Sequence, residues 1–139
     1  MGWDLGGGKR GRFSDFKGQV LVLDFYATWC DPCRASVPHL VQVQEKFGNQ
    51  GLQVVGLNVG GPDDLQYVSE FANELKIQYP LGVPEDVLSH FLLSNDTAIP
   101  QTFVFDRKGL LVKRIIGFSS EAETELDEAI KTALSSTAS

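Results

Sequence analysis

The chain has 139 residues, of which 42% are hydrophobic and 22% are charged, and its net charge is −6 at neutral pH. This length suits one domain with its own core, so residues 1–139 are expected to form a single domain. The acidic balance argues against nucleic acid as a partner, because phosphate binding depends on lysine and arginine. We interpret the one basic cluster, Lys9, Arg10 and Arg12, as a solvated turn. No apolar stretch of the sequence is long enough to cross a bilayer.

The first part of the chain predicts a hairpin, a strand and a helix. Residues 1–18 are rich in glycine and indicate a loose N-terminal hairpin. Residues 20–27 form a nearly continuous apolar run, which predicts a central strand buried on both faces, with Asp24 as its one charge. From Cys33 to Phe47, apolar residues recur at three- and four-residue steps, which indicates a helix that Pro38 should kink.

The middle of the chain predicts a second buried strand followed by mainly helical structure. Residues 52–59 form another apolar run, and Pro62 is expected to begin a helix. The apolar face of that helix comprises Leu65, Val68, Phe71, Ala72 and Leu75. A short extended piece at residues 79–81 and a brief helix at residues 84–91 are expected to follow.

The last third of the chain predicts a strand pair and a final helix. Residues 100–106 and 110–118 indicate two strands joined by a turn. Ser120 is expected to begin the last helix, with Glu123 completing a capping box, and residues 135–139 are expected to fray. Alternating strands and helices predict parallel strands, and the final pair adds antiparallel ones. The predicted fold class is therefore α/β, a three-layer α/β/α sandwich with a mixed central sheet.

Cys30 and Cys33 are the only cysteines of the chain, and they lie in the segment WCDPC. The segment follows a predicted strand and begins a predicted helix, and such positions carry ligands and chemistry in open α/β sheets. The unpaired N–H groups of a helix N-terminus stabilise a thiolate, so the pKa of Cys30 should lie below that of a free thiol. Cys33 lies one helical turn further on, close enough to attack a mixed disulfide at Cys30. We therefore interpret Cys30 as a nucleophile and Cys33 as a resolving thiol.

Two other interpretations of the cysteine pair are weaker. A bridge across two residues would constrain the unfolded chain little, so a purely structural disulfide is not favoured. A zinc site needs four ligands, and neither His39 nor His90 has the usual finger spacing to the cysteines. We therefore expect no metal, and no cofactor other than a redox-active disulfide between Cys30 and Cys33.

The segment VLDFYATWCDPCRASVP resembles the active-site segment of the thioredoxin superfamily. Together with GLQVVGLNVG and AIPQTFVFDRKGLLVKRIIGF, it makes nearly the whole chain similar to the TlpA/ResA-like thiol–disulfide oxidoreductases of AhpC/TSA-redoxin type. The resemblance implies a thioredoxin fold with an N-terminal hairpin and an extra segment before a cis-proline. It also implies a substrate-binding groove formed by Trp29, Asp31, Pro32, Ile99 and the cis-proline Pro100. Trp29 would shield Cys30, and the backbone of Ile99 would pair with an extended substrate segment.

Asp24 is the third catalytic residue that the sequence suggests. A charge inside a buried strand is costly unless it is neutralised or hydrogen-bonded, although a carboxylate at an exposed strand end remains an alternative. By resemblance to thioredoxin, Asp24 is a buried acid behind Cys33, and its raised pKa lets it take the proton of that thiol. Two positions depart from the family patterns. Gly56 stands where thioredoxin has a lysine, and Ser36 stands where ResA-like proteins of cytochrome maturation carry a glutamate, which argues against that pathway.

The leading functional hypothesis is a thiol–disulfide oxidoreductase that reduces protein disulfides, with an upstream thiol reductant as its electron donor. The charge of Asp31 should oppose thiolate formation at Cys30, which favours a reductant over an oxidant. A thiol peroxidase is one alternative, but Ala27 occupies the position where peroxiredoxins need a threonine. A non-catalytic thioredoxin-like binding module is another.

The expected working unit is a monomer, and its expected location follows from the resemblance alone. TlpA/ResA-like proteins imply a bacterial extracytoplasmic or periplasmic setting, with a leader or anchor removed. No secretory signal is visible at the N-terminus, so a cytoplasmic location stays open.

Overall fold

The computed structural model describes residues 1–136. Over these residues the chain builds one seven-stranded sheet in the order β2-β1-β5-β4-β3-β6-β7. The central strands β3 (Val20–Tyr26) and β4 (Leu52–Asn58) are parallel, and β5 (Leu81–Pro84) runs parallel to β4. On the other side of β3, the strands β6 (Gln101–Phe105) and β7 (Leu111–Ile116) are antiparallel. The predicted mixed sheet is confirmed.

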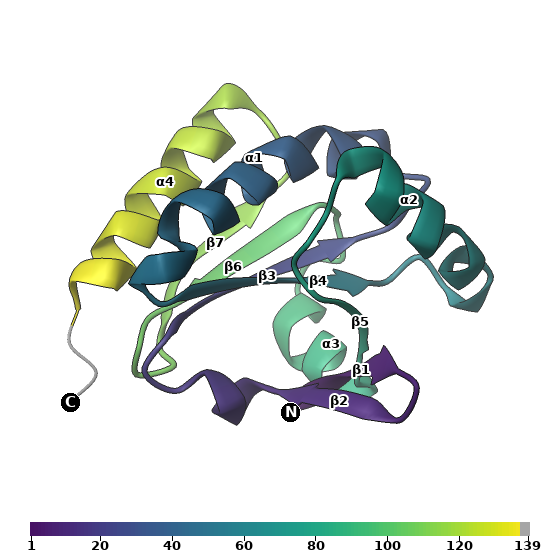
Figure 1. The fold of residues 1–139 in the computed structure, drawn as a ribbon, viewed down its shortest axis with the longest axis horizontal. Coiled ribbons are helices and arrows are strands. Elements are labelled where there is room, and N and C mark those ends of the chain that lie inside the picture. The colour runs from purple at the N-terminus through teal and green to yellow at the C-terminus, as the bar shows by residue number, and fades with distance from the viewer. Residues whose placement is uncertain (137–139) are drawn as a thin grey trace.

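Helices cover both faces of the sheet, as Figure 1 shows. The helices α1 (Asp31–Phe47), α2 (Val68–Leu75) and α4 (Ser120–Ser135) lie on one face, and α3 (Asp86–Leu93) lies on the other. Three short 3-10 segments join these elements: η1 (Phe13–Phe16), η2 (Gly48–Gln50) and η3 (Pro62–Tyr67). Within residues 1–136, none of the helices has the length and apolar character that a membrane span requires.

The alternation of side chains along β3 determines which face Asp24 occupies. Successive residues of a strand point to opposite faces of the sheet. Val22 packs in a cluster with residues of α1 and α4, and Tyr26 packs in a cluster that contains Cys33 of α1. Leu23 packs instead with residues of α3. Asp24 is two residues away from both Val22 and Tyr26, so its side chain points to the same face of the sheet as theirs. Its carboxyl group therefore faces α1.

The N-terminal hairpin is present as predicted, but it is not loose. β1 (Gly2–Gly6) pairs with β2 (Lys9–Arg12) and also with β5, so the hairpin extends the main sheet. Trp3 is 1% exposed and packs in the core on the α3 side. A Cβ atom at Gly11, opposite Trp3, would collide with the indole ring. A glycine at this position therefore lets the tryptophan side chain pack across β2.

The helix that was expected to begin at Pro62 differs from the prediction. Residues 62–67 form the 3-10 segment η3, and the α-helix begins only at Val68. A 3-10 turn contains three residues rather than 3.6, which changes the side that each residue faces. Leu65, predicted to lie in the core, is 43% exposed, whereas Asp64 is only 3% exposed. Phe71 is buried, as predicted.

Helix α4 begins at Ser120, as predicted, but its N-cap is not the expected one. Ser119 caps the helix, because its Oγ accepts a hydrogen bond from the Ala122 N–H at 3.0 Å. The predicted capping box between Ser120 and Glu123 is therefore wrong, because the neighbouring Ser119, an equally suitable cap, takes this role and Ser120 is the first helical residue. The side chain of Glu123 instead contacts His39 of α1. Residues 137–139 of the predicted frayed tail lie outside the described residues.

Candidate active site at Cys30 and Cys33

Cys30 and Cys33 lie where the loop after β3 enters α1. Cys30 is the N-cap of the helix, and the two cysteines form a disulfide with their Cα atoms 5.2 Å apart. The N–H of Cys33 donates to Sγ of Cys30 at 3.2 Å. Cys30 is 7% exposed and Cys33 is 0% exposed, so an approaching partner meets Cys30 first. The N–H groups of the first helical turn would stabilise a negative charge on Cys30 in the reduced protein.

The loop that precedes β6 lies against the cysteines. The peptide bond between Ile99 and Pro100 is cis, as predicted, and the Ile99 carbonyl oxygen lies 3.8 Å from Sγ of Cys30. The buried side chain of Gln101 donates to the carbonyl oxygens of Asp96 and Ala98, each at 3.0 Å. These bonds hold the loop from inside, so Gln101 belongs to the support of the site although the sequence did not single it out.

The residues predicted to contact a substrate differ in how much surface they offer. Trp29 is 65% exposed, and Asp31 and Pro32 are exposed beside it on the first turn of α1. Ile99 is half-buried and packs against the cluster that contains the cysteines, and Pro100 is buried. The surface at Cys30 therefore presents an aromatic ring next to a nearly covered sulfur.

Asp24 is 1% exposed and has one polar side-chain partner on the adjacent strand. Strand register places Gly56 of β4 on one side of it and Thr102 of β6 on the other. The Thr102 hydroxyl donates to the carboxylate at 3.4 Å. Burial raises the pKa of Asp24 to about 7, against the opposing effect of this hydrogen bond. Asp24 can therefore gain or lose a proton near neutral pH, and Gly56 supplies no cation beside it.

Asp64 of η3 is a second buried carboxyl group, and the sequence pattern did not point to it as part of the site. Thr28, two residues before Cys30, donates its N–H to Asp64 at 2.9 Å and also donates its hydroxyl. The amide of Asn58 donates to the same carboxylate at 2.9 Å. Burial acts to raise the pKa of Asp64, but the three hydrogen bonds outweigh it and hold the pKa below its usual value. Asp64 thus fixes the turn that leads into Cys30.

The sequence carries one signal for this contact, the pair Gly60–Gly61. A Cβ atom at Gly60 would lie 2.5 Å from Oδ2 of Asp64 and 2.9 Å from Cβ of Ala27. Only a residue without a side chain allows η3 to approach the turn this closely. The spacing does not reveal, however, which of the two aspartates after Pro62 turns inward.

Arg34 holds the same turn from the other side. Its guanidinium donates to the Thr28 carbonyl oxygen at 3.4 Å and forms an ion pair with Glu74 of α2. It also lies over the ring of Phe71, 5.3 Å from the ring centroid. The turn before Cys30 is thus tied to η3 through Asp64 and to α2 through Arg34.

We expect Asp64→Ala to lower the free energy of unfolding by about 3 kcal/mol, because it leaves buried donors of Thr28 and Asn58 without an acceptor. The ionised form of Asp64 is favoured by folding. Its contribution is therefore present above the ordinary pKa of 3.8 and is lost as the pH falls through the lowered value. Urea unfolding at neutral pH measures the loss. Asp63→Ala, the same change at the exposed neighbour, should alter stability little, and equal effects of the two changes would contradict the assigned role.

The chain is similar to known proteins over most of its length. The model of the AhpC/TSA family matches residues 4–114. The thiol-disulfide oxidoreductase ResA of Bacillus subtilis is 32% identical over 117 residues, which are 83% of this chain and 63% of ResA. ResA of Geobacillus kaustophilus is 28% identical over 120 residues, covering 85% of this chain and 66% of that protein. The chain thus spans slightly less than two thirds of the length of these relatives.

Solved structures share the fold. A thiol:disulfide interchange protein of the thioredoxin family from Chlorobium tepidum superposes with a TM-score of 0.80 at 30% identity, covering 96% of this chain and 92% of its own. This similarity confirms the thioredoxin fold predicted from the sequence. The matches agree with the cysteine pair at the start of α1 and the cis-proline beside it. The chain is a ResA/TlpA-like protein of the thioredoxin superfamily and belongs to the AhpC/TSA family.

Proposed function

We propose that the protein is a thiol–disulfide oxidoreductase that reduces disulfides in other proteins. The observation that carries this proposal is the Cys30–Cys33 disulfide at the N-terminus of α1, with Cys30 as the more exposed sulfur. The names of the ResA relatives and of the interchange protein support the same chemistry.

The reaction begins with both cysteines reduced. The Cys30 thiolate attacks a substrate disulfide, forms a mixed disulfide and releases one substrate sulfur as a thiolate. Cys33 then gives its proton to Asp24 and attacks Sγ of Cys30, which releases the second substrate sulfur. Two electrons pass to the substrate, and the Cys30–Cys33 disulfide remains. An upstream thiol reductant restores the dithiol.

Substrate recognition in this proposal uses the surface around Cys30. The backbone of Ile99 pairs with an extended segment of the substrate, and the exposed ring of Trp29 and the ring of Pro32 supply apolar contact. The exposed charge of Asp31 next to Cys30 disfavours the thiolate, which makes the couple more reducing. The protein acts as a monomer in an extracytoplasmic setting.

The peroxidase alternative is less favoured by the contacts at the turn. Peroxide reduction in peroxiredoxins uses a threonine hydroxyl near the reactive sulfur. Thr28 donates its hydroxyl to Asp64 instead, and the position before it is the buried Ala27. We therefore favour disulfide reduction as the function. If no turnover is found, the remaining alternative is a non-catalytic thioredoxin-like binding module.

The direction of electron flow is tested by equilibration with glutathione. We expect Cys30 and Cys33 to interconvert reversibly between dithiol and disulfide, with a midpoint potential well below about −180 mV, the value of protein disulfide isomerase. The change in Trp29 fluorescence and alkylation of free thiols report the ratio of the two forms. A midpoint potential above that value would show that the protein is an oxidant. If the cysteine pair never forms a disulfide, the proposed function is wrong.

A further inference from the structure

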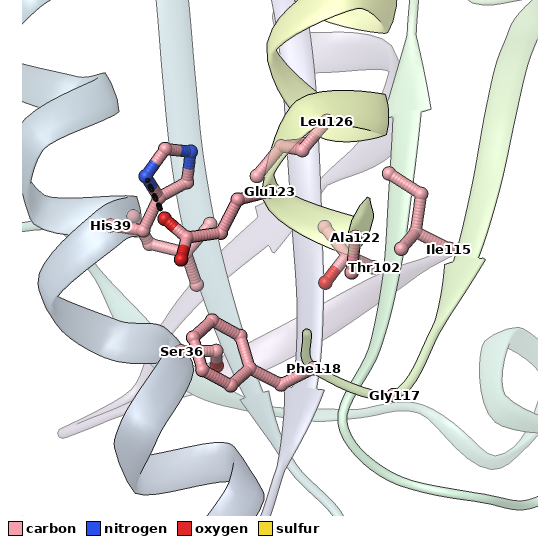
Figure 2. Close-up of a pocket in the computed structure, with 10 residues that line it drawn as sticks. Ser36, His39, Thr102, Ile115, Gly117, Phe118, Ala122, Glu123 and Leu126 are labelled. Atoms are coloured by element: carbon pink, nitrogen blue, oxygen red, sulfur yellow. Dashed lines mark ion pairs between the residues drawn. The ribbon is translucent and has the colours of Figure 1, made fainter. Parts of the chain in front are cut away.

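A small cavity lies between α1, α4 and the sheet, as Figure 2 shows. Its volume is about 20 Å³, which is enough space for one water molecule. Four of the side chains that line it are polar: Ser36, His39, Thr102 and Glu123. A site of this size with several polar groups on its wall meets the requirements for a bound water.

Thr102 connects this cavity with Asp24. It lines the cavity, and its hydroxyl is the group that donates to the Asp24 carboxylate at 3.4 Å. A hydroxyl can donate one hydrogen bond while it accepts another. When Asp24 is ionised, Thr102 donates to it. When Asp24 is protonated, its O–H can donate to the Thr102 oxygen, and the Thr102 hydrogen is then free to point into the cavity.

The other titratable groups that face Asp24 do not offer a route for its proton. They are the buried phenols of Tyr26 and Tyr79. Burial raises the pKa of Tyr26 to about 12 and raises that of Tyr79 further still, and among the described residues neither phenol forms a hydrogen bond with Asp24 through which a proton could pass. On the β4 side, Asp24 meets Gly56, which has no polar side chain. The Thr102 side is therefore the polar side of Asp24.

The outer wall of the cavity carries a histidine between two carboxylates. Nδ1 of His39 lies 3.0 Å from Glu123, and Nε2 lies 2.8 Å from Asp127. Figure 2 shows the first of these pairs bridging α1 and α4. An imidazole ring can take up a proton at one nitrogen and release one from the other. A proton that reaches Glu123 or His39 is at the protein surface, because Glu123 is partly exposed.

We propose that Asp24 exchanges its proton with solvent through this cavity, by way of the Thr102 hydroxyl, one water and the His39–Glu123 pair. The role in catalysis rests on the proposed function. After Cys33 gives its proton to Asp24, the carboxyl O–H passes a proton to the Thr102 oxygen while Thr102 passes its own to the water. The water passes a proton to Glu123 or His39, and solvent takes it from there. The same path runs inward when the disulfide is reduced, and no electrons move along it.

The first test follows the carboxyl carbon of Asp24 by NMR across pH in the disulfide form, with Asp24→Asn for assignment. In the wild type, rapid exchange should give one signal that moves continuously with pH. Ala122→Val narrows the cavity, and Thr102→Val removes the hydroxyl. Both should slow exchange until separate signals of the protonated and ionised forms appear. Only Thr102→Val should also raise the pKa of Asp24, because it removes a stabilising hydrogen bond.

Thr124→Val places the same side chain on the exposed side of α4 and should behave as the wild type. If the Asp24 carboxyl carbon still gives one signal that moves continuously with pH in both cavity variants, the proposed proton route is wrong. If one of the two variants does not fold, the other decides the question, because they change different walls of the cavity.

The second test measures the reaction of the reduced protein with excess glutathione disulfide, where attack by Cys33 limits the rate. We expect both cavity variants to react about tenfold more slowly. His39→Gln should also slow the reaction, and added imidazole should restore the rate in that variant alone. Equal rates in the wild type and all variants would remove the catalytic role of the route. A wild type that does not react at all would instead remove the proposed function, and the NMR titration would still decide whether the route exists.

Discussion

Replacing Cys30 with serine is expected to abolish insulin reduction, with a loss of about a thousandfold or more that leaves only the background of dithiothreitol alone. Cys30 is the more exposed of the two cysteines and lies at the helix N-terminus, and the hydroxyl of serine is not ionised at neutral pH. No mixed disulfide can then form. The rate is measured as the turbidity of reduced insulin chains with dithiothreitol as the electron donor.

Cys33→Ser is the matched control, because it makes the same chemical change at the buried cysteine. This variant keeps the nucleophile but cannot resolve the intermediate, so it should accumulate mixed disulfides through Cys30. Non-reducing electrophoresis and mass spectrometry would detect these complexes in a cell extract and name the partners. Full insulin reduction by Cys30→Ser, or trapping by that variant as strong as by Cys33→Ser, contradicts the assignment of the two roles.

Asp24→Asn is expected to stabilise the disulfide form at about pH 8, by about 4 kcal/mol, and to leave it unchanged at about pH 4. Burial raises the pKa of Asp24 from 3.8 to about 7, so between these values the folded protein holds a proton that the unfolded chain has released. The folded state then binds more protons than the unfolded state, and stability falls as the pH rises. Above the pKa that Asp24 has in the folded protein, its buried charge destabilises the fold by the full amount. Asparagine carries no charge and therefore avoids this destabilisation.

Urea unfolding of the oxidised protein at several pH values measures this effect. The stability of the wild type should fall between about pH 4 and about pH 7, while that of Asp24→Asn should stay more nearly constant there. Asp63→Asn makes the same change at an exposed position and should keep the wild-type slope. A wild type and an Asp24→Asn variant of equal stability at about pH 8 would show that Asp24 titrates normally.

A group that costs stability at neutral pH and still occupies the core points to a functional reason for its presence. Asp24→Asn should therefore slow the attack by Cys33 while it strengthens the fold. If Asp24→Asn is more stable than the wild type and Cys33 attacks equally fast, Asp24 takes no part in the reaction.

The cysteine site was predictable from the sequence because its determinants are local. An apolar strand, a short turn and a helix start with proline place Cys30 and Cys33 within a few residues. The cis bond at Pro100 lies far away in the chain and was predicted only through the family resemblance. The buried position of Asp24 followed from the apolar residues on both sides of it.

The contacts that support the site were not predictable from the sequence. They depend on which side chains each helix or 3-10 segment turns toward its neighbours in the folded protein. A regular helix from Pro62 would bury Leu65, whereas η3 buries Asp64 and brings it to Thr28. In the same way, a capping box would have occupied Glu123 within its own helix. The true cap at Ser119 leaves Glu123 to reach His39 on another helix.

The outermost strands of the sheet have a consequence for solubility. A sheet that ends in an unpaired strand offers its free backbone groups to other chains, and charged side chains on that strand discourage such aggregation. One end of this sheet is β2, which carries Lys9, Arg10 and Arg12, and the other is β7, which carries Lys113 and Arg114. The basic cluster near the N-terminus, which was predicted to lie in a solvated turn, instead lies on this edge strand, where its charges disfavour pairing with another chain. Two molecules that met edge to edge would bring like charges together, which disfavours the joining of their sheets.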